Sequence, residues 1–234
     1  MGSRTGIAWT DATYNPWRGC TKVSAGCANC YMYRDQRRYG EDPGVVVRAS
    51  EATFTAPLRW KEPRKVFVCS WSDFWHPHAD NWRDEALDVM ARAPQHTYQI
   101  VTKRPWGIPV DWIAPPNVWL GVSVEDQHAT ARVPALLTHR VAPGGVLWLS
   151  CEPLIARVTL RPEWLALLGW VVIGGESGPK HRPMELDWLR LLVDECDRAG
   201  VPVWVKQDSV ARPGQQGRIP DDLWRQEWPE EASR

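Results

Sequence analysis

From residue 66 onward, short apolar runs recur along the chain, separated by segments that are long enough to hold a helix. Each run is nearly continuous instead of alternating with polar residues, which is typical of parallel strands buried on both faces. We therefore predict six strands, at residues 66–71, 98–102, 118–124, 146–151, 170–173 and 201–205.

Between these runs, apolar residues recur at helical spacing and predict helices over 82–93, 126–138 and 186–199, the last of them stopped by Gly200. Strands that alternate with helices across short loops form a parallel α/β domain with right-handed crossovers. A further strand near 7–13 brings the total to about six to seven, too few for an eight-stranded barrel. An incomplete parallel (β/α) barrel and an open doubly wound sheet are the two alternatives.

The length of the chain, 234 residues, suits one domain with a sizeable core. Because no linker or low-complexity tract divides it, we predict a single α/β domain over residues 1–211. Residues 212–234 are polar and contain prolines, and we interpret them as a C-terminal tail or cap.

Charge and hydropathy exclude several classes of protein. The 28 basic and 28 acidic residues balance, so no global field draws the chain to nucleic acid or to an anionic membrane, although a local basic patch remains compatible with this balance. No apolar run approaches the roughly 20 residues of a membrane-spanning helix, and the N-terminus lacks the apolar region of a signal peptide. We therefore expect a soluble cytoplasmic protein without membrane contact.

Polar and charged side chains follow the predicted strands where these strands end. The carboxyl ends of parallel strands meet at one edge of the sheet, where α/β domains build their binding sites. Helix caps, and salt bridges among the same residues, are the structural alternative. One set suits contacts to a cofactor: Ser70, Asp73, Glu125, Glu152 and Glu176. A second set suits an anionic or aromatic substrate: Lys103, Arg104, Lys206 and Trp71.

Three of the six cysteines, Cys20, Cys27 and Cys30, lie close together after the first predicted strand. Three thiolates on one loop bind either a cuboidal iron–sulfur cluster or a zinc ion. A cluster held by three cysteines leaves one iron free to bind a small molecule. Zinc instead requires a fourth protein ligand, which His76 or His78 could supply.

Several short motifs accompany these cysteines. NPWRGC and SAGCANCY surround them, and TKRP, GVSVE, SCEPL, GGESG and VKQ stand at the ends of the predicted strands. With these motifs the chain resembles the three-cysteine-motif phage protein family, a compact relative of the radical S-adenosylmethionine (SAM) enzymes. Radical SAM enzymes typically place three and two residues between their cysteines, whereas this chain places six and two.

The resemblance implies a radical-SAM-like partial barrel in which Cys20, Cys27 and Cys30 hold a 4Fe-4S cluster. It implies that SAM binds at the open iron and, with an electron from a reductase or flavodoxin, breaks to give a 5′-deoxyadenosyl radical. The setting of the family points to the cytoplasm of a bacterium or of a phage-infected host. Together with the Lys–Arg–Trp set, it also points to a nucleotide or a modified nucleic-acid base as substrate.

A function of a different class fits the same residues. With zinc in place of the cluster, the chain is a zinc-stabilised nucleic-acid-binding or accessory protein without redox catalysis. The metal bound by the three cysteines therefore discriminates between the two hypotheses.

Overall fold

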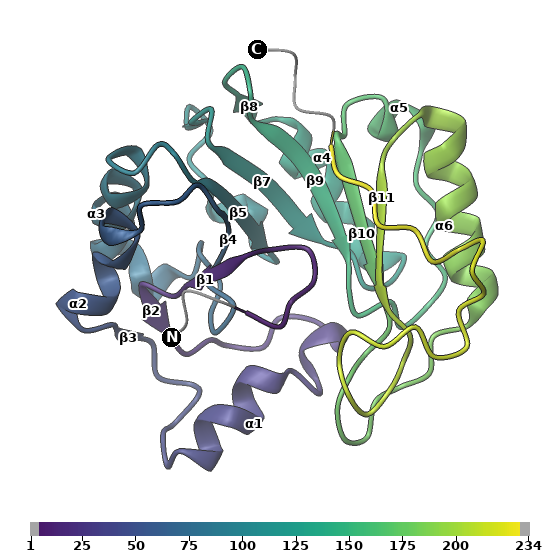
Figure 1. Ribbon diagram of the computed structural model, residues 1–234, viewed down its shortest axis with the longest axis horizontal. Coiled ribbons are helices and arrows are strands. Elements are labelled where there is room, and N and C mark those ends of the chain that lie inside the picture. The colour runs from purple at the N-terminus through teal and green to yellow at the C-terminus, as the bar shows by residue number, and fades with distance from the viewer. Residues whose placement is uncertain (1–4, 230–234) are drawn as a thin grey trace.

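A curled sheet of seven strands, all parallel, forms the centre of the protein in a computed structural model that describes residues 5–229 (Figure 1). The first four residues and the last five, which end the predicted tail or cap, lie outside the described residues. The strands follow the order β1 (Ala12–Tyr14), β4 (Lys65–Val68), β5 (Thr97–Thr102), β7 (Val118–Ser123), β9 (Val146–Cys151), β10 (Trp170–Gly174) and β11 (Val203–Gln207).

This order confirms the incomplete parallel barrel among the two alternatives. Each strand pairs with the strand of this sheet that precedes it in sequence, whereas a doubly wound sheet reverses its order at a switch point. All six predicted apolar runs contain a strand, and the early strand lies at Ala12–Tyr14, toward the end of the predicted stretch. β4 ends at Val68, before the predicted boundary, because Cys69 has a positive φ of 59° and leaves the extended conformation.

The three predicted helices are confirmed with small changes. α3 (Asp80–Ala91) and α6 (Leu186–Ala199) lie at the two flanks of the sheet in Figure 1, and Gly200 ends α6 with a φ of 68°. The segment 126–138 forms a 3₁₀ turn followed by α4 (Arg132–Leu137). Pro134 lies in the first turn of α4, where a backbone N–H has no acceptor within the helix.

The remaining elements are short. Two small ladders accompany the main sheet, one antiparallel and one parallel. They consist of β2 (Trp17–Arg18) with β3 (Val47–Arg48), and of β6 (Ile113–Ala114) with β8 (Arg140–Val141). The other α-helices are α1 (Tyr31–Arg38), α2 (Glu51–Phe54) and α5 (Pro162–Leu165).

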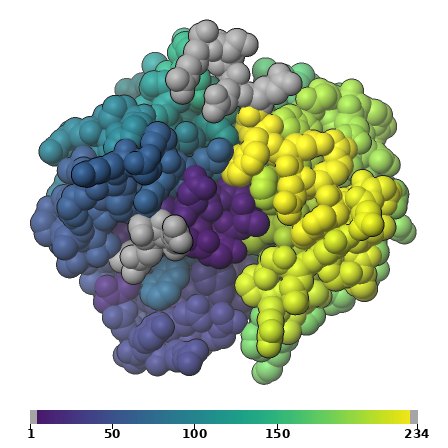
Figure 2. Space-filling model, in the orientation of Figure 1, coloured from purple at the N-terminus to yellow at the C-terminus, as the bar shows by residue number. Residues whose placement is uncertain are grey.

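Tryptophans fill one face of the sheet in a cluster that is separate from the main core. Trp119, Trp148, Trp170 and Trp204 come from the four adjacent strands β7, β9, β10 and β11, and Trp9 and Trp228 pack onto them from outside the sheet. In Figure 2 the N-terminal segment (purple) lies between the early elements (blue) and the C-terminal segment (yellow). Most of these tryptophans stand at or near the start of their strands, so the carboxyl ends are left to polar side chains.

The segment after residue 224 covers the edge of β11. The N–H of Val205 donates to the carbonyl of Arg225 at 2.7 Å, and the N–H of Glu227 donates to the carbonyl of Val203 at 2.9 Å. Pairing of this kind satisfies backbone groups that an open edge would expose. None of the helices between residues 5 and 229 is long and apolar enough to cross a bilayer.

Candidate functional site

The loop that carries the three cysteines, residues 19–30 and hereafter the Cys loop, lies across the carboxyl ends of the strands. The Ser24 hydroxyl donates to the Glu125 carboxylate after β7, and Asn29 Nδ2 donates to Glu176 Oε2 after β10 at 2.9 Å. Arg104, after β5, donates to the carbonyl oxygen of Thr21 at 2.7 Å. Contacts from three strand ends therefore hold the loop on this edge.

Two glycines let the Cys loop approach its neighbours this closely. Gly19 has a φ of 91°, and a Cβ at this position would lie 2.0 Å from the carbonyl oxygen of Val45. A Cβ on Gly26 would lie 2.8 Å from Cγ of Glu125. A larger residue at either position would displace the loop from the sheet.

All three cysteines of the loop are free thiols. Arg104 Nη1 donates to Cys20 Sγ at 3.7 Å, and the Ser24 hydroxyl lies 3.7 Å from Cys27 Sγ. Burial and nearby Asp73 raise the pKa of Cys20 to about 12, against the opposing effect of Arg104. Burial also raises the pKa of Cys30. Buried thiols with raised pKa values become thiolates when a metal replaces their protons.

The three cysteines of the loop are the donors of the predicted iron–sulfur cluster. Within residues 5–229, no group of three or more His, Cys, Asp or Glu side chains is arranged so that it could hold a metal ion. A cuboidal cluster spreads its thiolate ligands over separate irons, so three soft donors on one loop satisfy its protein requirement. Cys20, Cys27 and Cys30 would be those ligands, and Arg104 would donate a hydrogen bond to one of them.

Of the two histidines considered for zinc, His76 is buried and His78 is exposed. His76 Nδ1 accepts from the backbone N–H of His78 at 3.2 Å, which assigns the ring proton to Nε2, 3.1 Å from the Thr21 hydroxyl. Burial, with Arg104 and His78, lowers the pKa of His76 to about 4. Both ring nitrogens of neutral His76 are therefore engaged beside the Cys loop.

The lowered pKa of His76 predicts a loss of stability in mild acid. The unfolded chain protonates this histidine below its ordinary pKa of 6.5, whereas the folded protein does so only near 4. Between pH 7 and pH 5 the free energy of unfolding should therefore fall by about 2 kcal/mol through His76. Burial lowers the pKa values of His96 and His139 too. The total fall in the free energy of unfolding of the wild type therefore includes contributions from these two histidines.

Chemical denaturation at the two pH values isolates the share of His76. The His76→Gln variant should lose about 2 kcal/mol less than wild type between pH 7 and pH 5. The His128→Gln variant replaces an exposed histidine of another segment and, as control, should lose as much as wild type. Equal losses in wild type and His76→Gln would contradict the prediction.

Glu125 is the most deeply buried acid of the site and has no exposed surface. Its Oε2 accepts from Lys103 Nζ at 3.1 Å and from Arg132 Nη1 at 2.7 Å. Burial opposes ionisation of this carboxyl, but Lys103 and Arg132 outweigh it and lower the pKa. Glu125 is thus an ionised centre that links the Cys loop, β5 and α4.

Asp73 organises the end of β5. Its carboxylate accepts from the Thr102 hydroxyl at 2.6 Å, from the backbone N–H of Lys103 at 3.0 Å and from Arg104 Nη1 at 3.0 Å. Arg104 therefore bridges Asp73 and the Cys loop. Both Asp73 and Arg104 were expected at the site, and the structure brings them together there.

The remaining predicted carboxylates also have cationic partners. Glu176 accepts from Arg182 Nε at 3.0 Å and from Arg182 Nη2 at 2.5 Å. Burial raises the pKa of this carboxyl, but Arg182 and Asn29 outweigh burial, so the pKa is lowered. Glu152 pairs with Lys206. The salt-bridge alternative of the sequence analysis therefore describes Lys103, Arg104 and Lys206, each of which binds a carboxylate.

Two predicted residues lie toward β1 and α1. The hydroxyl of Ser70 and the side chain of Asn15 exchange hydrogen bonds at 3.0 and 3.2 Å. Trp71 stacks on Tyr39 beyond the end of α1, with ring centroids 6.4 Å apart and planes inclined by 29°. This pair is separate from the pocket described next.

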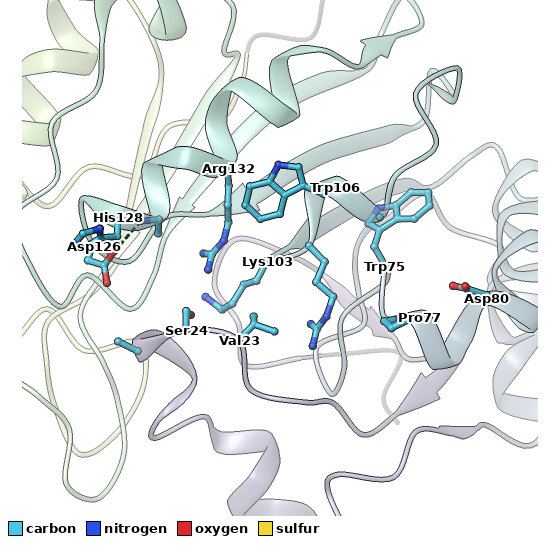
Figure 3. Close-up of a pocket in the computed structure, with 14 residues that line it drawn as sticks. Val23, Ser24, Trp75, Pro77, Asp80, Lys103, Trp106, Asp126, His128 and Arg132 are labelled. Atoms are coloured by element: carbon cyan, nitrogen blue, oxygen red, sulfur yellow. Dashed lines mark hydrogen bonds between the residues drawn. The ribbon is translucent and has the colours of Figure 1, made fainter.

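An open pocket of about 740 Å³ lies beside the Cys loop (Figure 3). Figure 3 shows the Lys103 amine and the Arg132 guanidinium pointing toward Ser24, with Trp106 nearby. The Trp106 side chain is 69% exposed. Of the predicted site residues, Lys103 and Arg104 line this pocket.

Sequence reasoning missed four residues that hold the Cys loop or its partners: Ser24, Asn29, Arg132 and Arg182. Arg132 lies inside a helix that was predicted, seven residues after Glu125, on the turn that faces the strand end. The short spacing between Glu125 and an arginine at the start of the predicted helix could have indicated this ion pair. For Arg182 and Asn29 the sequence offered none, because their contacts join segments that are far apart along the chain.

Comparison with known proteins assigns the chain to a protein family. No curated protein and no solved structure matches the chain. Residues 4–222 match the family described as protein of unknown function (DUF5131). This match includes the Cys loop, all seven strands of the sheet and every predicted site residue. The chain therefore belongs to the DUF5131 family.

Proposed function

We propose that this protein is an iron–sulfur enzyme of the radical SAM type, with a 4Fe-4S cluster held by Cys20, Cys27 and Cys30. The observation that carries the proposal is the position of the Cys loop, which is fastened over the carboxyl edge of an incomplete parallel barrel. This edge is where such folds bind ligands and carry out chemistry. With SAM bound there, a reduced cluster would supply one-electron chemistry that takes a hydrogen atom from the substrate through a 5′-deoxyadenosyl radical.

The residues of the edge are suited to a zwitterionic cofactor. SAM carries an ammonium group and a carboxylate, and the edge offers both carboxylates and cations within a few residues. In the pair of Glu152 and Lys206, both side chains keep some exposure (17% and 13%) while each touches the other. Arg104, which donates to Cys20 Sγ, would stabilise negative charge on that ligand.

The pocket beside the Cys loop suits a nucleotide or a modified base as substrate. Lys103 and Arg132 share the single negative charge of Glu125 and so keep a net positive charge for a phosphate, and the exposed Trp106 supplies a ring for stacking. A reductase or a flavodoxin would supply the electron. The protein's own task is to position substrate and cofactor and to keep water from the radical.

Metal and sulfide analysis of protein purified without oxygen tests the cluster first. We expect about four irons and four sulfides per chain with a broad absorption band in the visible range. One zinc without sulfide would overturn the cluster and leave the zinc-stabilised nucleic-acid-binding or accessory protein as the function.

A turnover assay then tests the reaction. With SAM and a strong reductant, the reconstituted protein should form 5′-deoxyadenosine, detected by chromatography and mass. The same protein without reductant is the control and should form none. If the cluster is intact and reducible but no 5′-deoxyadenosine forms, the radical SAM assignment is wrong.

A further inference from the structure

A cationic and aromatic surface lies on and around α1, and the Tyr39–Trp71 pair described above belongs to it. We name it the α1 patch, and it comprises Arg34, Arg37, Arg38, Lys180, Tyr39 and Trp71. In Figure 1, α1 lies at the lower margin of the fold, away from the helices that flank the sheet.

The charges of the patch are exposed and largely uncompensated. Among the described residues, Arg37, Arg38 and Lys180 form no ion pair, and all three are exposed. Arg34, one turn before Arg38 on the same helix face, pairs with Asp35 at 2.9 Å and is still half exposed. A chain with zero net charge thus concentrates free cations on one helix.

Lys180 joins this surface because the loop after β10 touches α1. A Cβ on Gly178 would lie 2.9 Å from Arg34 Nη1, and Asn29 Nδ2 donates to the carbonyl of Lys180 at 3.1 Å. The acid of this loop, Glu176, is already bound by Arg182. Of the two acids that follow α1, Glu41 is bound by Arg18, and Asp42 is exposed and accepts from the backbone N–H of Gly44. Glu176 and Glu41 are therefore engaged elsewhere, and the four cations of the patch outnumber Asp35 and Asp42.

The pair of Tyr39 and Trp71 indicates which kind of anion the α1 patch binds. Tyr39 is 69% exposed, stacks on Trp71 and follows Arg37 and Arg38 in the chain, so an exposed ring is the sequence neighbour of these cations. Cations that follow a phosphate backbone, next to rings that stack on bases, are the features of proteins that bind single strands. A double helix keeps its base faces covered, and a phospholipid headgroup has no ring to stack.

The patch borders the Cys loop on the side away from the pocket-lining residues Lys103 and Trp106. Cys30 immediately precedes Tyr31, the first residue of α1, and the Tyr31 hydroxyl donates to the carbonyl of Ser70 at 2.6 Å. Trp71 is the next residue. A strand stacked at Trp71 and bound along α1 therefore passes beside the Cys loop.

We propose that the α1 patch binds single-stranded nucleic acid and presents it to the Cys loop. This inference rests on the proposed function and deepens it, because it names a polymer as the substrate class of that site. The arginines and Lys180 contact phosphates, and Tyr39 with Trp71 stacks on bases.

Fluorescence anisotropy with labelled single-stranded DNA and RNA, on the full chain purified without oxygen, tests the proposal. Binding should weaken as the salt concentration rises. For each phosphate contact, the logarithm of the binding constant should fall by about 0.7 for every tenfold rise in salt concentration. The Arg37→Glu, Arg38→Glu double variant should bind at least about tenfold more weakly at low salt, with a slope reduced by about 1.4. The matched control is Arg92→Glu, Arg198→Glu, which makes the same change of charge at exposed positions just after α3 and near the end of α6 and should bind like wild type.

Stacking is tested at Tyr39, whose exposure makes substitution harmless to folding. Tyr39→Ala should weaken binding about tenfold, and Tyr39→Phe should restore it, because only the ring is needed. Equal binding of duplex and single strand, or wild-type affinity in the double variant, would overturn the proposal. So would binding of anionic lipid vesicles without binding of oligonucleotides, which would make the patch a membrane contact.

Binding does not require SAM cleavage, so the two proposals fail separately. Oligonucleotide binding without 5′-deoxyadenosine would leave the α1 patch and remove the radical SAM assignment. Formation of 5′-deoxyadenosine without oligonucleotide binding would do the opposite.

Discussion

Replacing Cys27 with alanine is expected to remove nearly all iron and sulfide from protein purified without oxygen. Cys27 is buried in the Cys loop, and no other cysteine of the described chain lies in this loop apart from its two partners. A cluster held by only two thiolates would have two irons without protein ligands and would be readily lost. Iron and sulfide content, read with the visible absorption band, measure the loss.

Cys196→Ala is the matched control for this experiment. Cys196 is also a buried free thiol, but it lies in α6 and packs in the main core. Its replacement should lower stability modestly through a small cavity and leave the cluster content unchanged. If Cys27→Ala retained full iron and sulfide while Cys196→Ala behaved as expected, the ligand assignment would be wrong.

The second large effect is expected at Glu125. The Glu125→Gln variant keeps the shape of the side chain but leaves Lys103 and Arg132 without their shared counter-charge. Removing one partner of a buried ion pair typically costs about 3–5 kcal/mol. For a chain of this size, that corresponds to a fall in Tm of roughly 10 °C. Thermal and chemical unfolding measure it.

Glu163→Gln is the control, because the Glu163 carboxylate lies 3.9 Å from Arg161 and both side chains are about two-thirds exposed. Its effect on the free energy of unfolding should stay within about 0.5 kcal/mol.

The pH dependence of stability gives a second readout at Glu125. A lowered pKa in the folded state stabilises the protein above the ordinary carboxyl pKa, and this contribution is lost as the pH falls through the folded value. Wild type should therefore lose more stability in acid than Glu125→Gln, and identical acid losses would contradict the assignment.

Strand positions were readable from the sequence because burial on both faces leaves a local signal. Each apolar run needs only its own residues to be recognised, and parallel strands bury both faces along their whole length. The gathering of Asp73, Glu125 and Glu176 at one edge followed from the same local reading, since parallel strands bring their carboxyl ends together.

The role of the tryptophans was not readable in this way. The sequence contains 16 of them, spread along the chain, and either stacking on a ligand or burial was compatible with that number. The structure shows six of them packed together against the sheet, with Trp148 and Trp170 paired in register. These tryptophans meet only because the sheet pairs strands that are distant in sequence.

The sequence by itself determined the strands of the main sheet, three of the helices, the α/β class of the fold and the carboxylates that follow strand ends at one edge. Only the tertiary structure decided which cation binds which acid, that Arg132 and Arg182 take part, and that Trp71 lies with Tyr39 apart from the pocket. The physical reason is the range of the interactions. Burial and helical spacing depend on neighbouring residues, whereas ion pairs and ring stacking depend on side chains from separate segments, whose distances are set only when the sheet curls and the Cys loop closes over it.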